Sequence, residues 1–311
     1  MKINFVQSNN VKSNIFNAFN NFFLKYSDFE YFITEKVLRT ADICHYHRPN
    51  LEDKLLKNSV VTVHHDLSDN DPWFDSSNFM ERYKEASHIV CLNSIQQNIL
   101  KQNGIENTTV IPHGYRDDLF KLRKLKLYDK NAKICLGIIS KRYGRRVKGE
   151  AYLLELAKRL DSDKFKFILV GEGRCEDVVL LNSYGFEVKV FENLPYILYP
   201  EVYKKLDFLL MISIFEGGPA NLPEALASGV PVIANNIAMA YDMIVDEKNG
   251  LLLSGDYSID VEKINSLFDN DGKLFNKLQK NLQLKQDIIT WKEVVQRYEK
   301  IYIEVGNQKW N

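Results

Sequence analysis

The chain has 311 residues, 45% of them hydrophobic and 26% charged, and its 41 basic and 41 acidic residues cancel to a net charge of zero. That composition is typical of a soluble globular protein large enough for two domains, and the neutral charge argues against a nucleic-acid partner. No stretch approaches the roughly 18 apolar residues of a membrane span, "MKINFVQSNN" lacks a signal-peptide pattern, and the four cysteines lie too far apart for a zinc site or a disulfide framework, so we expect a cytoplasmic protein.

Short apolar runs alternate with helical patterns along the first third of the chain. The helical pattern "IQQNILKQNG" ends in Gly104, a residue suited to stopping a helix. We expect strands at residues 2–8, 41–47, 59–64, 88–93 and 108–113.

A basic segment, "KLRKLKLYDK" (residues 121–130), separates this part from a second alternating series, and we interpret it as a domain boundary. "GEAYLLELAKRL" has apolar residues at helical spacing. Such alternation predicts an α/β protein with two Rossmann-like, doubly wound domains facing each other across a cleft, where ligands bind at the carboxyl ends of the strands. The strands expected in the second series are residues 133–140, 164–173, 186–192, 208–215 and 231–236.

The segment "EGGPANLPEALASGVPVIA" follows an apolar run and carries two acids, Glu216 and Glu224, eight positions apart. Asn221 is a good N-cap and Pro223 suits a first helical turn, so the chain should enter a helix there. Both acids then lie just beyond the carboxyl end of a strand. A ligand site, a capping box between Asn221 and Glu224, and a solvated loop acid all remain open on the spacing alone.

A basic loop lies between the strand at 133–140 and the next helix. Five cations fall within eight residues, which fits either a solvated face or an anion site; they are Lys141, Arg142, Arg145, Arg146 and Lys148.

His45 and His47 share one face of a predicted strand. They could ligate a metal, but no third ligand is evident, so ordinary strand-end histidines are the preferred interpretation.

Several of these segments resemble retaining glycosyltransferases of the GT-B fold, in particular glycosyltransferase family 4. "FEGGPANLPEALASGVPVIA" is similar to the donor-site motif of that family, and "LVGEGR" to its Gly-acid-Gly turn. "VTVHHDL", "TTVIPHGY" and "TWKEVVQRYEKIYIEV" also resemble family segments, and the resemblance covers about residues 60 to 305. It implies transfer of a sugar from a UDP- or GDP-linked donor to a glycan or lipid-linked acceptor in surface polysaccharide or glycoconjugate synthesis, with retention and without a metal or other cofactor.

The resemblance also implies roles for individual residues. Catalytic roles fall to His64 (or His65), Glu216, Arg142 and Lys148, with Arg145 and Arg146 as alternatives to Arg142. Glu224 would hold the ribose hydroxyls and Glu216 the transferred sugar, since carboxylates form strong charge-assisted hydrogen bonds. The remaining donor-binding residues implied are Gly217, Gly218, Pro219, Ala220, Asn221, Leu222, Gly171, Glu172 and Gly173, beside Arg142 and Lys148.

The expected domains are an acceptor-side domain (1–125), a donor-binding domain (126–290) and a C-terminal helix (291–311) that returns to the first. The first sixty residues depart from the family, because no glycine follows the first strand, where Ser8, Asn9 and Asn10 are left to supply donors. A nucleotide-sugar epimerase and a non-catalytic nucleotide-sugar-binding subunit are the alternatives. Partners would be the donor and a glycan, lipid-linked or protein-linked acceptor, and peripheral contact with the inner face of a membrane is a further expectation.

Overall fold

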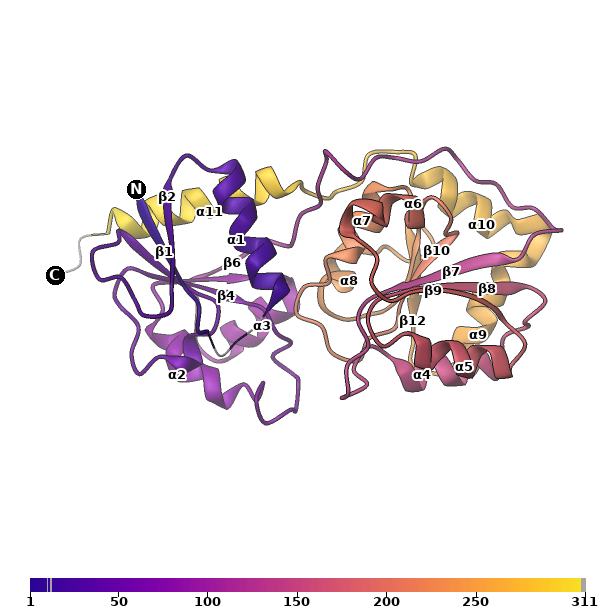
Figure 1. The fold of residues 1–311 in the computed structure, drawn as a ribbon, viewed down its shortest axis with the longest axis horizontal. Coiled ribbons are helices and arrows are strands. Elements are labelled where there is room, and N and C mark those ends of the chain that lie inside the picture. The colour runs from indigo at the N-terminus through magenta and orange to yellow at the C-terminus, as the bar shows by residue number, and fades with distance from the viewer. Residues whose placement is uncertain (10, 12, 309–311) are drawn as a thin grey trace. The chain divides into compact units, whose positions relative to one another are not determined.

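The computed structural model describes residues 1–9, 11 and 13–308, so Asn10, one of the expected donors, lies outside the described residues. The chain forms two compact units (Figure 1). Unit 1 comprises Met1–Gly114, Glu216–Pro219 and Ile289–Asn311, and unit 2 comprises Tyr115–Phe215 and Ala220–Ile288.

Unit 1 is built on a six-stranded parallel sheet with the order β2-β1-β3-β4-β5-β6. The order reverses between β1 and β3, so their carboxyl ends mark the point where doubly wound sheets usually bind ligands. Its strands are β1 (Lys2–Val6), β2 (Glu30–Thr34), β3 (Ile43–Tyr46), β4 (Ser59–Val63), β5 (His88–Cys91) and β6 (Thr108–Val110).

Helices cover both faces of this sheet, because successive strand side chains alternate between two apolar clusters. Ile3, Phe5 and Ile43 pack with α1 and α11, whereas Cys44 and Tyr46 pack on the side of α2 and α3. The helical segments of unit 1 are α1 (Asn14–Tyr26), η1 (Pro49–Leu51), α2 (Ser77–Glu85), α3 (Ser94–Gln102) and α11 (Trp291–Gly306).

Unit 2 holds a second six-stranded parallel sheet with the order β12-β11-β10-β7-β8-β9. Here the order reverses between β7 and β10. The strands are β7 (Ile134–Ile139), β8 (Phe165–Val170), β9 (Glu187–Phe191), β10 (Phe208–Met211), β11 (Val232–Asn235) and β12 (Gly250–Leu253).

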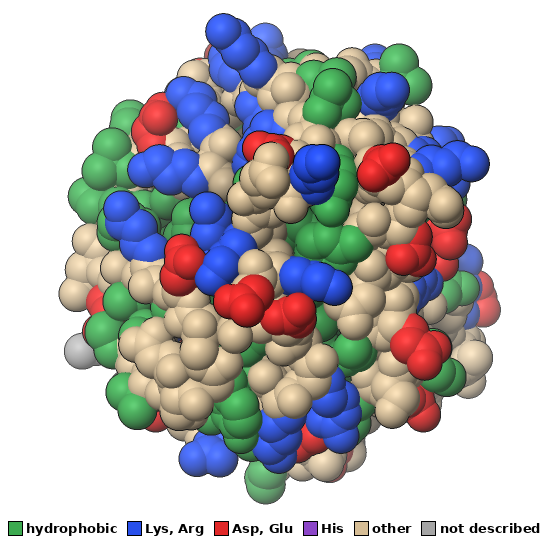
Figure 2. Space-filling view, turned by 90° about the vertical axis from the view of Figure 1, so that its right-hand side faces the viewer, with side chains coloured by type: hydrophobic (Ala, Val, Ile, Leu, Met, Phe, Trp, Pro, Cys, Tyr) green, Lys and Arg blue, Asp and Glu red, His purple; other side chains and the backbone are tan. Residues whose placement is uncertain are grey.

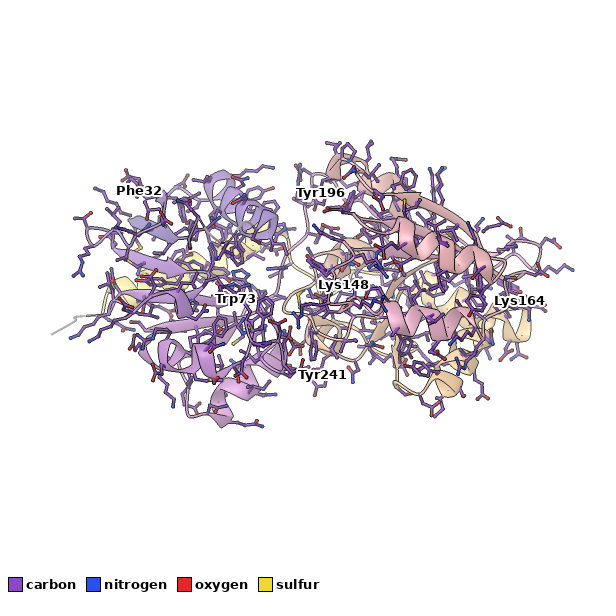
Figure 3. The ribbon with its side chains drawn as sticks, turned by 60° about the horizontal axis from the view of Figure 1, so that its bottom comes forward. Phe32, Trp73, Lys148, Lys164, Tyr196 and Tyr241 are labelled. Atoms are coloured by element: carbon purple, nitrogen blue, oxygen red, sulfur yellow. The ribbon has the colours of Figure 1, made fainter. Side chains whose placement is uncertain are left out.

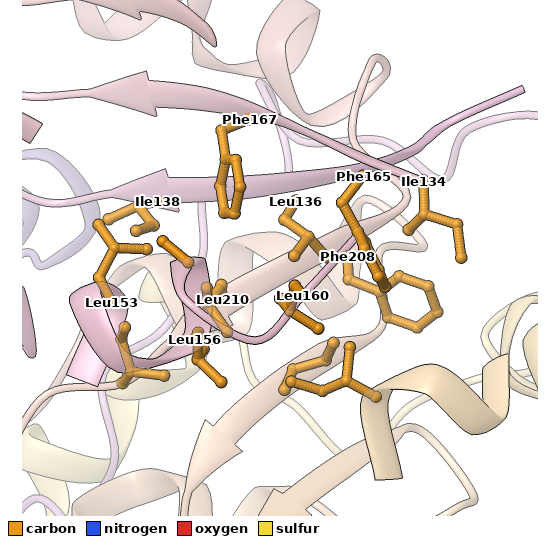
Figure 4. Packing of buried hydrophobic residues seen from close by; sticks show 14 of the residues in the cluster. Ile134, Leu136, Ile138, Leu153, Leu156, Leu160, Phe165, Phe167, Phe208 and Leu210 are labelled. Atoms are coloured by element: carbon orange, nitrogen blue, oxygen red, sulfur yellow. The ribbon is translucent and has the colours of Figure 1, made fainter. Parts of the chain in front are cut away.

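Two apolar clusters again lie on opposite faces. Leu136 and Phe167 pack toward α4, α9 and α10 (Figure 4), whereas Ile139 and Met211 pack toward α6, α7 and α8. The predicted α/β class with two doubly wound domains is confirmed. The helical segments of unit 2 are α4 (Glu150–Ala157), α5 (Cys175–Ser183), η2 (Tyr196–Leu198), α6 (Tyr199–Tyr203), α7 (Asn221–Ala227), α8 (Ala238–Met243), α9 (Tyr257–Asn265), η3 (Ser266–Phe268) and α10 (Asp269–Asn281).

The basic segment 121–130 lies within unit 2, where it carries a buried arginine. Arg123 is 7% exposed and donates to Gly229 O and Tyr203 O, each at 3.1 Å, and to Gln279 Oε1 at 2.9 Å. Through Arg123 the segment therefore hydrogen-bonds to the end of α6, the turn after α7 and helix α10, all in unit 2. The expected limits of the functional domains at residues 125 and 290 stay a prediction.

Two surface features bear on the expected partners. Within residues 1–9, 11 and 13–308, no helix is both long enough and apolar enough to cross a bilayer. On the face drawn in Figure 2, basic and acidic side chains are interspersed rather than gathered by sign.

Candidate functional site

The loops that follow β7 and β8 pack directly against each other. Arg142 N donates to Glu172 O at 2.9 Å, and a Cβ on Gly171 would lie 2.4 Å from Ser140 O. Gly171 also has a φ of +138°, which L side chains rarely adopt, so this contact requires glycine. The fully buried Arg174 donates from Nε to Ser140 O and from Nη2 to Ser140 Oγ, both at 2.8 Å. The predicted basic loop and the Gly-acid-Gly turn are thus one packed structure.

The guanidinium of Arg142 contacts acids of α5. Its Nε lies 3.2 Å from Asp177 Oδ1, and Nη1 donates to Glu176. Asp177 also accepts from Arg174 Nη1 at 2.7 Å, so one buried carboxylate holds two arginines. A phosphate that binds Arg142 therefore either displaces these carboxylates from the guanidinium or binds to the guanidinium beside them.

The other cations of the loop have different environments. Lys141 pairs with Glu172 at 2.5 Å, and Arg145 and Arg146 are exposed. Lys148 is half-buried, with its Nζ 5.6 Å from the centre of the Tyr143 ring; it is labelled in Figure 3. Of these four, Lys148 is therefore the one with the most restricted position.

Gly149 fixes the position of Lys148 next to β10. Its φ is +85° and a Cβ there would lie 2.0 Å from Ile212 O, so only glycine fits. Ile214 N also donates to Val147 O at 2.8 Å. The end of the basic loop thus lies at the carboxyl end of β10, the strand that leads to Glu216 and Glu224.

The start of α7 differs from the predicted N-cap. The helix begins at Asn221, and Ala220 is the N-cap residue, with no side-chain cap bond. Asn221 instead donates from Nδ2 to Ile139 O at 2.8 Å. The prediction that Asn221 caps the helix was wrong, because its side chain finds a partner at the end of β7, 82 positions away in sequence.

Glu224 lies in the first turn of α7 and is 4% exposed. Its Oε1 accepts from Tyr196 OH at 2.5 Å and its Oε2 from Tyr203 OH at 3.1 Å. Burial raises the pKa of Glu224 to about 7, and the two tyrosine hydrogen bonds oppose that rise. The carboxylate is therefore partnered by tyrosines of η2 and α6, and α7 has no side-chain cap, so the capping-box alternative is wrong.

Residues 216–219 of the same motif pack with unit 1. Glu216 is half-buried and its N–H donates to Asp66 Oδ2 at 3.3 Å. Asn93 Nδ2 donates to Gly217 O at 2.8 Å, and a Cβ on Gly217 would lie 2.3 Å from His64 O. Gly217 thus contacts the loops after β4 and β5 through its backbone. The other predicted donor-binding residues here are Gly218 and Ala220, which are partly or well exposed, and Pro219 and Leu222, which are buried.

The two histidines after β4 occupy different environments. His64 is partly exposed, and its Nε2 lies 3.0 Å from His47 Nδ1. His65 is buried, with its ring 4.1 Å from that of Phe79 between centroids. Desolvation lowers the pKa of His65 to about 3 and that of His64 well below 6.5, so both rings are neutral at pH 7. The exposure favours His64 as the residue that can meet a ligand.

His45 and His47 bond to protein groups. His45 binds Tyr302 OH at 2.6 Å and Thr62 Oγ1 at 2.8 Å, and His47 Nε2 binds Asn20 Oδ1 at 2.8 Å. Over the part of the chain that the structure describes, no three His, Cys, Asp or Glu side chains gather as metal ligands.

Sequence reasoning missed Tyr196, Tyr203, Asp177 and Arg174. They act on predicted site residues through tertiary contacts, and Tyr196, Tyr203 and Asp177 belong to no short motif. The "GEGR" turn already contained Arg174, but its burial beneath Ser140 has no sequence signal.

Comparison with solved structures identifies the fold. A sucrose-phosphate synthase from Thermosynechococcus elongatus aligns over 98% of this chain and 99% of its own, with a TM-score of 0.75 at 13% identity. HepE from Anabaena, solved with UDP and glucose, aligns over 98% of this chain and 100% of its own, with a TM-score of 0.69 at 16% identity. The predicted GT-B fold is confirmed.

Relatives in sequence cover less of the chain. An uncharacterised glycosyltransferase of Methanocaldococcus jannaschii is 26% identical over 247 residues, which are 72% of this chain and 60% of the relative. An uncharacterised protein in the cps region of Klebsiella pneumoniae is 33% identical over 129 residues, 40% of this chain and 33% of that protein. The chain thus spans at most about three fifths of these relatives.

The family model described as Glycosyl transferases group 1 matches residues 124–285, just over half of the chain. That match contains the basic loop, the Gly-acid-Gly turn and both glutamates. The chain belongs to the Glycosyl transferases group 1 family.

Proposed function

We propose that this protein is a retaining glycosyltransferase that moves a hexose from a UDP- or GDP-linked donor to a glycan or lipid-linked acceptor. The observation that carries the proposal is the strand order of unit 2. β7 and β10 are neighbours at the reversal point, the basic loop follows β7, and the chain leads from β10 to Glu224. Groups suited to a diphosphate and to a ribose thus follow the two strands where such sheets bind nucleotides.

The diphosphate is assigned to Lys148 and Arg142. Lys148 directly precedes Gly149, the N-cap of α4, so this lysine and the backbone N–H groups of a helix start are neighbours in the chain. The leaving diphosphate gains negative charge in the transition state, and fixed cations stabilise that charge without a metal. Solved HepE with UDP and glucose, and the pneumococcal O-GlcNAc transferase GtfA with UDP and GlcNAc, support a UDP-type donor.

The ribose is assigned to Glu224, with Gly171, Glu172 and Gly173 beside it as pocket backbone. Above its pKa of about 7 the carboxyl group of Glu224 is ionised and accepts strongly from neighbouring hydroxyls. Because Tyr196 OH already occupies Oε1, a bound ribose must share that oxygen or displace the phenol.

Retention implies that the new bond forms on the face from which the diphosphate leaves. The acceptor hydroxyl oxygen bonds to the anomeric carbon as the carbon–oxygen bond to the diphosphate breaks, and a phosphate oxygen takes the hydroxyl proton. Glu216 binds hydroxyls of the transferred sugar, and the neutral His64 orients that sugar. Neither forms a covalent intermediate in this scheme.

Two observations support an acceptor in surface polysaccharide synthesis. The family acts on sugars, and one relative is encoded in a cps region. The acceptor itself is addressed in the next subsection.

A donor screen tests the proposal. UDP- and GDP-hexoses are incubated with the protein, with and without EDTA and acceptor sugars, and release of nucleotide diphosphate is measured. The proposal predicts release from one nucleotide class, unaffected by EDTA and strongly reduced in Lys148→Ala. Release that requires a metal, or conversion of the nucleotide sugar without release, would point to another mechanism or to an epimerase.

A further inference from the structure

A second candidate ligand site lies in unit 1, at its own strand-order reversal. Arg48 follows β3 and directly precedes η1. β3 and β1 are the neighbours between which the order of this sheet reverses. The position is therefore where a doubly wound sheet of this order would bind a ligand.

The guanidinium of Arg48 is held between two aromatic rings. Its central carbon lies 5.1 Å from the ring centre of Phe16 in α1 and 5.4 Å from that of Phe74 in the loop after β4. These two contacts restrict the position of the guanidinium.

Two of the Arg48 nitrogens have no protein partner. Nε and Nη1 are buried and donate to no described residue, and no ion pair of Arg48 is formed within the described ranges. A buried charge without a counterion is costly, and most buried arginines are paired. In this chain Arg174, buried in unit 2, shows the usual pattern, with acids and a carbonyl around it.

The imidazoles near Arg48 are neutral at pH 7. The charge of Arg48 helps to depress the pKa of His47, His64 and His65, after the larger effect of their desolvation, which places these imidazoles near the guanidinium. His64 Nδ1 and both nitrogens of His65 are also buried without a partner.

The aspartates of the nearby loop accept hydrogen bonds from several groups. Glu216 N donates to Asp66 at 3.3 Å, and Asp71 N donates to the buried Asp69 at 3.0 Å. Asp66 accepts from Ser68, and Asp71 accepts from Trp73 N. Asp75 accepts from Ser77 N and Oγ. None of these contacts involves Arg48, so the site combines one desolvated positive charge with imidazole nitrogens that have no hydrogen-bond partner.

We propose that Arg48 binds an anionic group, a carboxylate or a phosphate, on the acceptor of the transfer reaction. Arginine suits this role because its planar fork matches both anions in a bidentate arrangement. Trp73, which is labelled in Figure 3 and is 48% exposed, precedes Phe74 in the chain and offers an apolar ring on the same loop for the body of the sugar. The inference rests on the proposed function, since it names the acceptor class as an acidic or phosphorylated glycan.

The test measures anion binding to the full chain by NMR titration. UDP is titrated first and kept saturating, so that the diphosphate site is filled. Inorganic phosphate, glucuronate and neutral glucose are then titrated separately into wild type, Arg48→Gln, Arg48→Lys and the control Arg82→Gln. Arg82 also belongs to unit 1 and is partly buried, but it pairs with Glu81 at 3.0 Å and Glu85 at 3.1 Å.

We expect phosphate or glucuronate to bind wild type, with affinity at least about tenfold weaker in Arg48→Gln, less affected in Arg48→Lys, and unchanged in Arg82→Gln. The anion that binds tells whether the acceptor group is a phosphate or a carboxylate. Glucose affinity and UDP affinity should not depend on Arg48. The urea midpoint of Arg48→Gln should equal or exceed that of wild type, because an unpaired charge is removed.

Three results would overturn the inference. They are failure of both anions to bind wild type, equal anion affinity in Arg48→Gln and Arg82→Gln, and a lowered urea midpoint in Arg48→Gln, which would assign the arginine to structure. Failure of UDP itself to bind is a separate result: it contradicts the proposed donor site, and the anion titrations without UDP still decide whether Arg48 holds an anion.

Discussion

The carboxylate of Glu224 accepts hydrogen bonds from the hydroxyls of Tyr196 and Tyr203, so a ribose must compete with these two phenols for it. If Glu224 holds the ribose, Glu224→Gln should weaken binding of the nucleotide diphosphate by about 1.5–3 kcal/mol, the range for a hydrogen bond to a charged group. Calorimetric titration measures this, with Glu201→Gln, an exposed acid of α6, as the control. Wild-type affinity in Glu224→Gln would refute the ribose assignment.

The raised pKa of Glu224 also predicts a pH dependence of stability. The folded state keeps the proton up to about pH 7 and the unfolded state loses it near 4.5, so this residue lowers the free energy of unfolding as pH rises from 4.5 to 7. Glu224→Gln should therefore gain stability relative to wild type across this interval, measured by urea unfolding at several pH values. If the difference in the free energy of unfolding between the two proteins does not change with pH, the pKa of Glu224 is not raised by folding.

Lys148 tests the diphosphate assignment. Lys148→Ala should lower kcat more than it raises KM for the donor, because the diphosphate gains charge as it leaves. Arg142→Ala should act in the same way. If Arg145→Ala or Arg146→Ala is the damaging change while Arg142→Ala is harmless, the assignment within the basic loop is wrong.

At the scale of elements, α5 supports the basic loop through Asp177. Asp177 is a buried partner of both Arg142 and Arg174, whereas Glu176 meets Arg142 from the exposed side, with 67% of its side chain accessible. Asp177→Ala should reduce the free energy of unfolding by about 3–5 kcal/mol, because it strips a buried arginine of its closest acid. Glu176→Ala should cost below about 1 kcal/mol. Urea unfolding compares them, and equal losses would contradict the buried network.

Most of the strands, but few of the contacts between distant segments, could be predicted from the sequence. Apolar runs predicted ten of the strands, eight central ones and the edge strands β6 and β9, because strands of parallel sheets covered on both faces are rich in apolar residues. β2 and β12 were missed; the burial of β2 is mixed, which leaves little apolar signal, and β12 is only four residues long. The sequence motif correctly placed Glu224 after β10. The hydrogen bonds from Tyr196 and Tyr203 to Glu224, the bond from Asn221 to the end of β7 and the position of Arg48 depend on contacts between distant segments, which no local pattern predicts.

For the whole molecule, the histidines of unit 1 predict sensitivity to acid. Desolvation depresses the pKa of His47 and His65 to about 3 and of His113 to about 4, and His45 and His64 are also lowered. The unfolded chain binds these protons near pH 6.5, so stability is full above 6.5 and falls as pH decreases below it.

Desolvation also lowers the pKa of His88. The effect of the histidines opposes that of Glu224, and six histidines should outweigh one carboxyl group. We therefore expect the urea midpoint, followed by tryptophan fluorescence, to fall between pH 6.5 and 5; one of the three tryptophans, Trp291, has its ring 5.4 Å from that of His113 between centroids. His47→Gln should flatten the decline. A midpoint independent of pH over this range would contradict the neutral, buried state of these rings.

The stereochemistry of the product is the most direct test of the proposed retaining mechanism. The active nucleotide α-hexose from the donor screen is incubated with the protein and an acceptor, and the anomeric configuration of the new linkage is read by proton NMR. We expect an α-linked product, formed with retention and without a covalent role for Glu216. A β-linked product would contradict the retaining mechanism and the roles proposed for Glu216 and His64.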